Sequence, residues 1–256
     1  MEKKNKPLSD DEKERYMRQM LVIGEDNQRQ IREKRVLQVG LGGLGSPLAF
    51  YLVSAGIGEL VVFEDDVLSL SNLGRQILYE TPDIGKSKAD LAKRRLDALN
   101  PNVKITIHKE RLTIDNYKKY IDGIDYLVDA SDNFETKFLI SDIGVIENIP
   151  FTIGAVQGFE GQVISTLPRR SACYRCVFRE PPKNKAVSPI PVINSMCGLV
   201  GSFQSMEVLK GLIKEGIRVI NALVILDGLR NELNIINLKK SKKCPVCGHL
   251  EPVKSK

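Results

Sequence analysis

The 256-residue sequence contains no run of 18 apolar residues, no tryptophan and only 6% aromatic residues. The first absence excludes a transmembrane helix, and residues 1–4 lack the apolar segment of a secretory signal, so we expect a cytoplasmic protein with no membrane partner. Because aromatic residues are few and the lysines and arginines are spread along the chain, the composition argues against nucleic-acid binding. The net charge of +6 instead suggests an anionic partner such as a nucleotide or an acidic protein.

A glycine-rich turn follows a short apolar run over residues 36–39 and precedes a stretch of helical composition. The turn reads Gly40-Leu41-Gly42-Gly43-Leu44-Gly45. Gly40 permits the tight turn, Gly42 lets the backbone approach a phosphate, and Gly45 lets the helix pack against the strand. We therefore predict a nucleotide phosphate site along the backbone of Gly40, Gly42, Gly43 and Gly45.

An acidic cluster ends the next apolar run, over residues 60–63. Glu64 lies about 20 residues after the last glycine, where it can accept hydrogen bonds from ribose hydroxyls. A dehydrogenase needs no basic cluster just beyond this acid, whereas a triphosphate needs fixed cations and amide donors. The sequence therefore favours ATP over NAD. The predicted ligands on this side are Glu64, Asp66, Ser71, Asn72, Arg75 and Lys88.

Alternating strand and helix patterns predict an α/β fold, with a Rossmann-like, mainly parallel sheet flanked by helices. We expect one domain over residues 1–256. It comprises an N-terminal helical arm (1–34), a nucleotide-binding half (35–150) and an antiparallel β extension with a zinc-stapled C-terminus and the surface that binds the carrier protein (151–256). In the arm, Ser9 and Glu12 form a capping box for a helix that begins near Asp10.

Four of the five cysteines form two Cys-x-x-Cys pairs, Cys173 with Cys176 and Cys244 with Cys247. Two such pairs supply four thiolates, which suits tetrahedral zinc and leaves no open catalytic position. Because the gap between the pairs is far longer than in a zinc ribbon, we predict a structural site that staples the end of the chain to the β extension. A disulfide is disfavoured in a cytoplasmic protein, and a thioredoxin-like motif lacks its fold context.

Motifs of one family run in order from about residue 14 to residue 248. On these motifs the sequence resembles the ThiF/MoeB/HesA family, relatives of ubiquitin-activating enzymes. The matching residues are Arg15-Tyr16-Met17-Arg18-Gln19, the glycine turn, Ser71-Asn72-Leu73-Gly74-Arg75-Gln76, Lys88, Asp132-Asn133, the two cysteine pairs and Gly201-Ser202-Phe203-Gln204-Ser205-Met206-Glu207.

The resemblance implies a homodimeric enzyme that uses Mg·ATP to adenylate the C-terminal Gly-Gly carboxylate of a small ubiquitin-like sulfur carrier. Such carriers serve thiamine or molybdopterin synthesis. It also implies that Arg18 reaches across the dimer to the ATP phosphates of the other subunit, and that Asp132 orders Mg²⁺ with Asn133 beside it. Composition alone favours an exposed helix residue for Arg18, and the alternative role of Asp132 is that of a helix N-cap.

Two positions depart from the family pattern. The family usually has Asp at the ribose position, where this chain has Glu64, and it places a reactive cysteine in a loop position that falls near Val187 here. Cys197 lies too close to the following helix to replace that thiol, so we interpret it as a small buried apolar residue. Thioester formation is therefore in doubt, whereas adenylation is not affected.

Two other functions remain compatible with the sequence. One is ATP-dependent dehydration of a threonylcarbamoyl group on tRNA, which the basic charge favours slightly and which would show strongly salt-dependent binding. The other is a non-catalytic partner protein that binds nucleotide and zinc. The intact Arg75, Lys88 and Asp132 argue against the second.

Overall fold

The computed structural model describes residues 7–181, 189–213 and 220–250, and they form one eight-stranded sheet. The strand order is β3-β2-β1-β4-β5-β6-β7-β8, parallel from β3 to β5 and antiparallel from β5 to β8. The predicted parallel sheet with an antiparallel extension is confirmed. The strands are β1 (Arg35–Val39), β2 (Glu59–Phe63), β3 (Lys104–His108), β4 (Tyr126–Asp129), β5 (Phe151–Gln157), β6 (Glu160–Thr166), β7 (Ala222–Asp227) and β8 (Glu232–Asn237).

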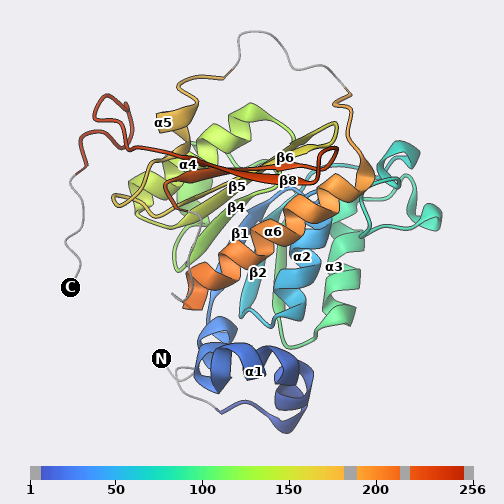
Figure 1. Ribbon diagram of the computed structural model, residues 1–256. Coiled ribbons are helices and arrows are strands. Elements are labelled where there is room, and N and C mark those ends of the chain that lie inside the picture. Colours follow the sequence, from blue (N-terminus) through green and yellow to red (C-terminus); the bar gives the residue numbers. More distant parts are fainter. Residues whose placement is uncertain (1–6, 182–188, 214–219, 251–256) are drawn as a thin grey trace.

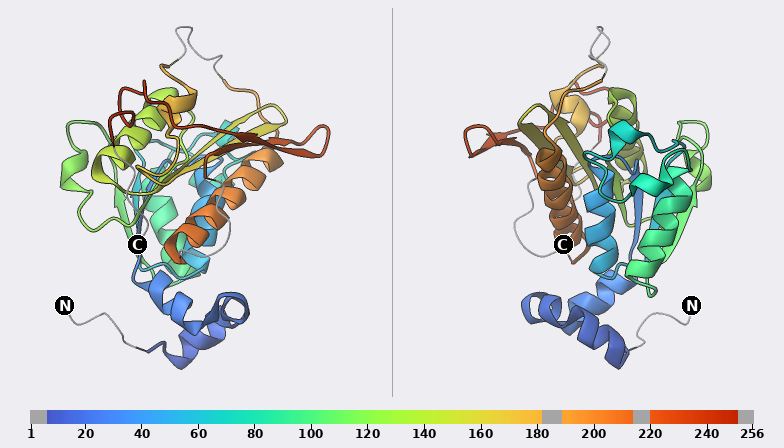
Figure 2. Two further views of the ribbon diagram at one scale, coloured as in Figure 1. Left: turned by 60° about the vertical axis from the view of Figure 1, so that its left-hand side comes forward. Right: turned by 90° about the vertical axis from the view of Figure 1, so that its right-hand side faces the viewer.

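Helices cover both faces of the sheet (Figures 1 and 2). Helices α2, α3 and α6 pack on one face and share one apolar core with it, whereas α4 and the short α5 pack with a second core on the other face. The helices are α1 (Asp10–Arg32), α2 (Gly45–Ser54), α3 (Lys88–Leu99), α4 (Phe134–Glu147), α5 (Tyr174–Val177) and α6 (Asn194–Ile213). None of those in the described parts of the chain has the length and apolar content that a bilayer crossing requires.

The N-terminal arm is a helix that breaks once and folds back against the end of α2. Its start is confirmed, because Ser9 and Glu12 form the predicted capping box before Asp10. Gly24 has a φ of 81° and interrupts the helix. Gln19 and Gln28, from the two segments, both donate hydrogen bonds to the carbonyl oxygen of Ala55. The arm is therefore attached to the distal end of α2 (Figure 1).

The segment after β3 forms a 3₁₀ turn over Tyr117–Lys119 and no α-helix. A one-turn segment of this kind lacks the length to sustain α-helical hydrogen bonding.

Candidate functional site

The glycine turn lies where β1 ends. Gly40 has a φ of 92°, which a residue with a side chain rarely adopts. A Cβ on Gly45 would overlap the carbonyl oxygen of Gly40, so close packing of α2 on the turn requires glycine there. A Cβ on Gly42 would meet only the Gln76 amide nitrogen, 3.6 Å away. Gly42 is therefore the position where the backbone is open to a ligand, at the N-terminal end of α2.

The first acid after β2 is bound to this turn. The carboxylate of Glu64 is buried and accepts hydrogen bonds from the N–H of Leu41, at 2.7 Å, and of Asp66, at 3.0 Å. Burial raises the pKa of Glu64, although these two hydrogen bonds oppose the shift. The hydroxyl of Tyr79 donates to the carbonyl oxygen of Leu41 at 3.1 Å. Glu64 thus supports the turn directly, and its role toward a ribose stays a prediction.

Lys88, the first residue of α3, brings a nearly buried positive charge to the same edge. Its ammonium group lies 2.8 Å from a carboxylate oxygen of Asp66, whose side chain is 60% exposed. Lys88 itself is 3% exposed. Because Lys carries three donors and one is used by Asp66, the group can also bind a phosphate oxygen.

The loop after β2 carries the remaining basic and amide groups. The guanidinium of Arg75 donates to the carbonyl oxygen of Ser71 at 3.1 Å, and its stem would lie 3.3 Å from a Cβ on Gly43. The side-chain oxygen of Asn72 accepts from the N–H of Ser69 at 3.1 Å. Arg75 therefore lies against the glycine turn, whereas the oxygen of Asn72 is used within its own loop.

Asp132 lies in the loop that follows β4, and its side chain is exposed. The interpretation of Asp132 as the cap of α4 is wrong, because Asn133 holds that position. The Asn133 side-chain oxygen accepts from the N–H of Thr136 at 2.9 Å. Within residues 7–181, 189–213 and 220–250, no hydrogen bond or ion pair engages the Asp132 carboxylate. It is therefore available to a ligand such as Mg²⁺, which prefers oxygen donors.

A buried ion pair beneath this loop escaped the sequence analysis. The ammonium of Lys137, on α4, lies 2.7 Å from Asp129, 2.8 Å from the Ser131 carbonyl oxygen and 2.7 Å from the Gly154 carbonyl oxygen. Complete burial raises the pKa of Asp129, although Lys137 opposes that shift. The sole signal in the sequence is an aspartate at the end of an apolar strand.

Strand order brings most predicted residues together. The glycine turn, the Glu64–Asp66 cluster and the Asp132 loop follow β1, β2 and β4, and these are adjacent strands whose carboxyl ends share one edge. The N–H of Gly40 donates to the carbonyl oxygen of Phe63 at 3.0 Å, and Gly40 also packs on Ala130. This edge, where β1 separates β2 from β4, is the switch point at which α/β sheets bind ligands.

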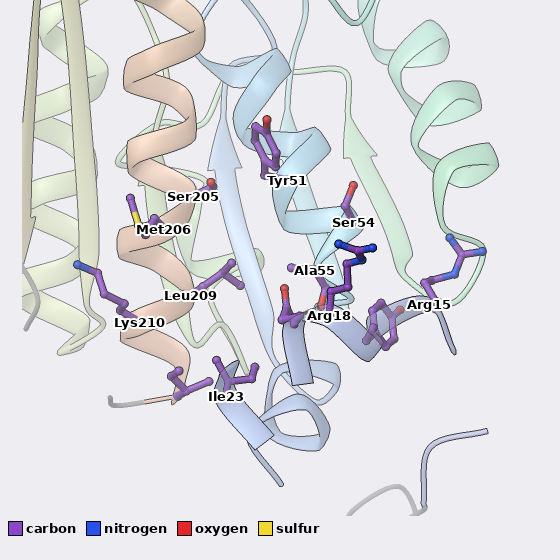
Figure 3. Close-up of a pocket in the computed structure, with 13 residues that line it drawn as sticks. Arg15, Arg18, Ile23, Tyr51, Ser54, Ala55, Ser205, Met206, Leu209 and Lys210 are labelled. Carbon is purple, nitrogen blue, oxygen red and sulfur yellow. Dashed lines mark hydrogen bonds between the residues drawn. The ribbon is translucent and has the colours of Figure 1, made fainter. Parts of the chain in front are cut away.

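Arg18 does not join the other predicted site residues at this edge of the sheet. It lies on α1 and lines a cavity of about 440 Å³ with Tyr51, Ser54 and Met206, between α1, α2 and α6 (Figure 3). Ser54 is the last residue of α2, and the glycine turn precedes the first. A ten-residue helix spans about 15 Å, so Arg18 lies roughly that far from the turn of its own chain.

The four cysteines of the two pairs converge, as the spacing predicts. Their sulfur atoms lie within 4.8 Å of one another, and four of the separations fall between 3.4 and 3.9 Å. Tetrahedral zinc with bonds of about 2.3 Å separates its sulfurs by about 3.8 Å, so the donor set fits zinc. The N–H of Ser241 also points at the sulfur of Cys176, at 3.4 Å.

Cys197 lies apart from this cluster, in the first turn of α6. Its side chain is 2% exposed, and its sulfur would lie 2.9 Å from a Cβ on Gly43. Burial raises the pKa of the Cys197 thiol, although the nearby charge of Arg75 opposes this. These properties support the interpretation of a buried apolar residue that packs on the glycine turn. The loop position near Val187 lies outside the described residues.

The fold and the edge at β2, β1 and β4 define a nucleotide-binding α/β protein of the Rossmann-like class. A family model described as the ThiF family matches residues 16–246, and the chain belongs to this family.

Comparisons with individual proteins agree with this family membership. The chain is 39% identical to the sulfur carrier protein adenylyltransferase of Thermus thermophilus over 93% of this chain and 92% of that protein. It is 37% identical to the sulfur carrier protein ThiS adenylyltransferase of Escherichia coli over 91% and 94% of the two chains. Among solved structures, E. coli MccB shares the fold, with a TM-score of 0.83 at 19% identity over 97% of this chain and 76% of that one.

Proposed function

We propose that the protein binds Mg·ATP and adenylates the C-terminal Gly-Gly carboxylate of a small ubiquitin-like sulfur carrier protein, with release of pyrophosphate. The observation that carries this proposal is the convergence of an open glycine turn, Lys88 and the free Asp132 carboxylate on one sheet edge. The similarity to two sulfur carrier adenylyltransferases extends over more than nine-tenths of the chain, which supports the same substrate class.

The arrangement suits attack of a carboxylate on the α-phosphate. The carboxylate is already a nucleophile, so no general base is needed, and catalysis consists of positioning and charge stabilisation. The Gly42 backbone, Arg75 and Lys88 would hold the phosphates, with Asn72 and Ser71 in the same loop. Glu64 would lie at the ribose. Asp132 would hold Mg²⁺ together with phosphate oxygens, and the metal would neutralise charge on the leaving pyrophosphate.

We infer that the carrier docks on the sheet face opposite α6, beside β5. This face carries a small hollow of about 10 Å³, lined by residues of β5, β6 and β7 and by Tyr174 and Phe178, at the start of α5 and just after its end. Gly154 also lines it, and the carbonyl oxygen of Gly154 shares the Lys137 ammonium with Ser131, next to Asp132. A carrier on this face would therefore have its C-terminus a short distance from the α-phosphate.

Exposed apolar side chains on the opposite face suit a second copy of the chain. They come from α1, α2, α6 and β8 and include those that border the Arg18 cavity. Isolated exposed apolar residues are normal, but a patch across four elements marks an interface. These residues are Met17, Leu21, Val22, Tyr51, Leu199, Met206, Leu233 and Ile235, each at least 49% exposed. Since Arg18 lies on this face and far from its own glycine turn, we infer a homodimer in which it serves the other subunit's site.

The decisive experiment is ATP–pyrophosphate exchange with Mg²⁺, run against each small host protein that ends in Gly-Gly. We expect exchange that depends on one carrier, and no exchange when the same carrier lacks its last glycine. This result would establish the reaction and name the pathway. ATP binding without exchange for any carrier would exclude the proposed reaction and favour the tRNA dehydratase or the non-catalytic partner.

Mixed dimers test whether Arg18 acts between subunits. Arg18→Ala and Asp132→Ala should each abolish exchange. After subunit mixing, a heterodimer would contain one site with both residues intact if Arg18 acts in trans, so about one quarter of the sites should regain activity. No recovery in verified heterodimers would place Arg18 in its own subunit's site or outside catalysis.

A further inference from the structure

Lys137 is a buried charge with three hydrogen-bond partners. It is 5% exposed, and its acceptors come from three separate segments: Asp129 at the end of β4, Ser131 in the following loop and Gly154 on β5. An ammonium has three donors, and here all three are used. Burial of an ion pair is costly, so its location demands an explanation beyond stability.

The pair is continued by further hydrogen bonds around the same loop. The hydroxyl of Ser131 donates to the other carboxylate oxygen of Asp129, at 2.5 Å. The Gln204 amide, from α6 on the opposite face of the sheet, donates to the carbonyl oxygen of Asp129 at 2.8 Å. The Asn133 side chain caps α4. Both residues that flank Asp132 are therefore fixed, one by Lys137 and Asp129 and the other by the helix.

Of the three loop residues 131–133, only Asp132 has a side chain that makes no hydrogen bond to the described residues. The Ser131 carbonyl and hydroxyl are bound beneath the loop, and the Asn133 side chain is bound to Thr136. The Asp132 carboxylate is exposed. We propose that Lys137 is a positioning residue that, with Asp129, holds the loop so that the Asp132 carboxylate faces the metal–triphosphate.

The role of Lys137 rests on the proposed metal site at Asp132, but it can be tested separately from the adenylation reaction. Groups that orient a metal ligand typically change metal affinity by about 10-fold to 100-fold when they are removed. A pair that only stabilised the fold would change the melting temperature and leave the effect of Mg²⁺ on ATP affinity untouched. ATP affinity, measured by calorimetry with Mg²⁺ and again with EDTA, separates the two without any turnover.

Three variants are needed, because Lys137→Met alone leaves the Asp129 carboxylate buried without its partner. The double variant Asp129→Asn with Lys137→Met removes that charge and should restore stability, yet the Ser131 carbonyl still lacks its ammonium donor. Lys137→Arg keeps a cation with several donors. The matched control is Lys118→Met, which removes an exposed lysine paired with Glu147 at the other end of α4.

We expect ATP affinity in EDTA to stay within about 2-fold of wild type in every folded variant. The gain in ATP affinity on adding Mg²⁺ should fall by about 10-fold in the double variant, recover in Lys137→Arg, and remain unchanged in Lys118→Met. A folded double variant with the wild-type Mg²⁺ effect would overturn the positioning role and leave the proposed function standing. A wild-type protein that binds no ATP, or binds it without regard to Mg²⁺, would instead overturn the proposed site and the positioning role together.

Discussion

The two edges of the sheet, formed by β3 and β8, differ in how far they are buried by neighbouring segments. Strand β3 forms one edge of the sheet and is exposed at one of its five residues, β2 beside it is buried along its whole length, and β1 is buried at its three central residues. Strand β8, at the other end of the same sheet, is exposed at all six residues, and the β7–β8 hairpin projects beyond the helices (Figure 2). The nucleotide half therefore depends on a large apolar core, whereas the extension has little apolar cover at its edge.

A metal bound by the cysteine cluster would compensate for that difference. Cys173 and Cys176 flank the start of α5, just after the extension's first two strands, and Cys244 and Cys247 follow β8. A metal held by all four would join the beginning and the end of the extension. If the nucleotide half is stabilised by its apolar core and the extension by a bound metal, removal of the metal should destabilise the extension and leave the nucleotide half folded.

Loss of the metal should have the largest effect. Cys173→Ser, or chelation of the wild type, should unfold the segments around the cluster and cost about 5 kcal/mol or more, because a structural zinc site contributes its binding energy to folding. ATP binding to the nucleotide half should persist. Hydrogen exchange with and without chelator, together with metal analysis, measures both.

The control is Cys197→Ser, which changes a buried cysteine outside the cluster and should leave the metal content at the wild-type value. If hydrogen exchange and the melting temperature stay the same after verified metal loss, the cluster is not a structural site. If ATP binding is also lost, the two halves are not independent.

The next largest effect should come from Asp132→Ala, which alters the nucleotide half without touching its core. Loss of a metal ligand worth several kcal/mol should lower kcat for exchange by about 100-fold or more, at an unchanged melting temperature. Asp65→Ala is the control, since Asp65 belongs to the same site edge but pairs with the exposed Arg111. It should change kcat by less than about 3-fold. Equal effects of the two variants on kcat would contradict the proposal that Asp132 is a metal ligand.

A smaller effect is expected at the surface assigned to the second subunit. Met206→Glu places a charge on an apolar side chain that is 50% exposed and borders the Arg18 cavity. The dimer dissociation constant should rise by about 10-fold, and exchange at low protein concentration should fall with it. Sedimentation at several concentrations measures the first quantity. Ile146→Glu, at 53% exposure on α4, is the matched control and should change neither. A Met206→Glu variant that remains as dimeric as the control would place the interface elsewhere.

The sequence predicts the secondary structure of the nucleotide half better than the side-chain contacts that form its site, and the reason is physical. Apolar periodicity and glycine spacing are local, so strands, helices and the Gly40–Gly45 turn follow from residues close together in the chain. The four cysteines also converge as predicted, because their spacing reflects metal geometry. Contacts between distant segments leave no such local signal.

Lys137 is an example of a buried residue that the sequence does not predict. Its neighbours in the chain fit an ordinary helix, and a lysine there would be expected at the surface. It is buried because β4, its loop and β5 bring three acceptors together. Glu64 illustrates the same point: its spacing indicates a ribose ligand, but only the folded turn shows that Leu41 and Asp66 donate to its carboxylate. The cap of α4 is Asn133 and not Asp132, because the N-cap is the residue immediately before the first helical residue, which is Phe134.

The smallest predicted effect concerns a carboxylate that supports the parallel half. Glu59, at the start of β2, accepts from Thr106 and pairs with Lys104 and Arg35. Burial alone would raise its pKa, but the hydrogen bonds from Thr106 and Lys104, together with Arg35, hold the pKa of Glu59 below its usual value.

A carboxylate with a lowered pKa in the folded state stabilises the protein fully above its unfolded pKa of about 4.3, and that contribution is lost as pH falls through the folded pKa. Glu59→Gln should therefore cost about 1 kcal/mol at pH 7 and progressively less below pH 4, as urea unfolding at pH 7 and pH 3.5 would show. Glu80→Gln, which removes the charge of a side chain that is 59% exposed, should change stability by less than about 0.5 kcal/mol at either pH. A cost for Glu59→Gln that does not change with pH would mean that the ionised carboxylate contributes nothing to the parallel half, which would then depend on its apolar core alone.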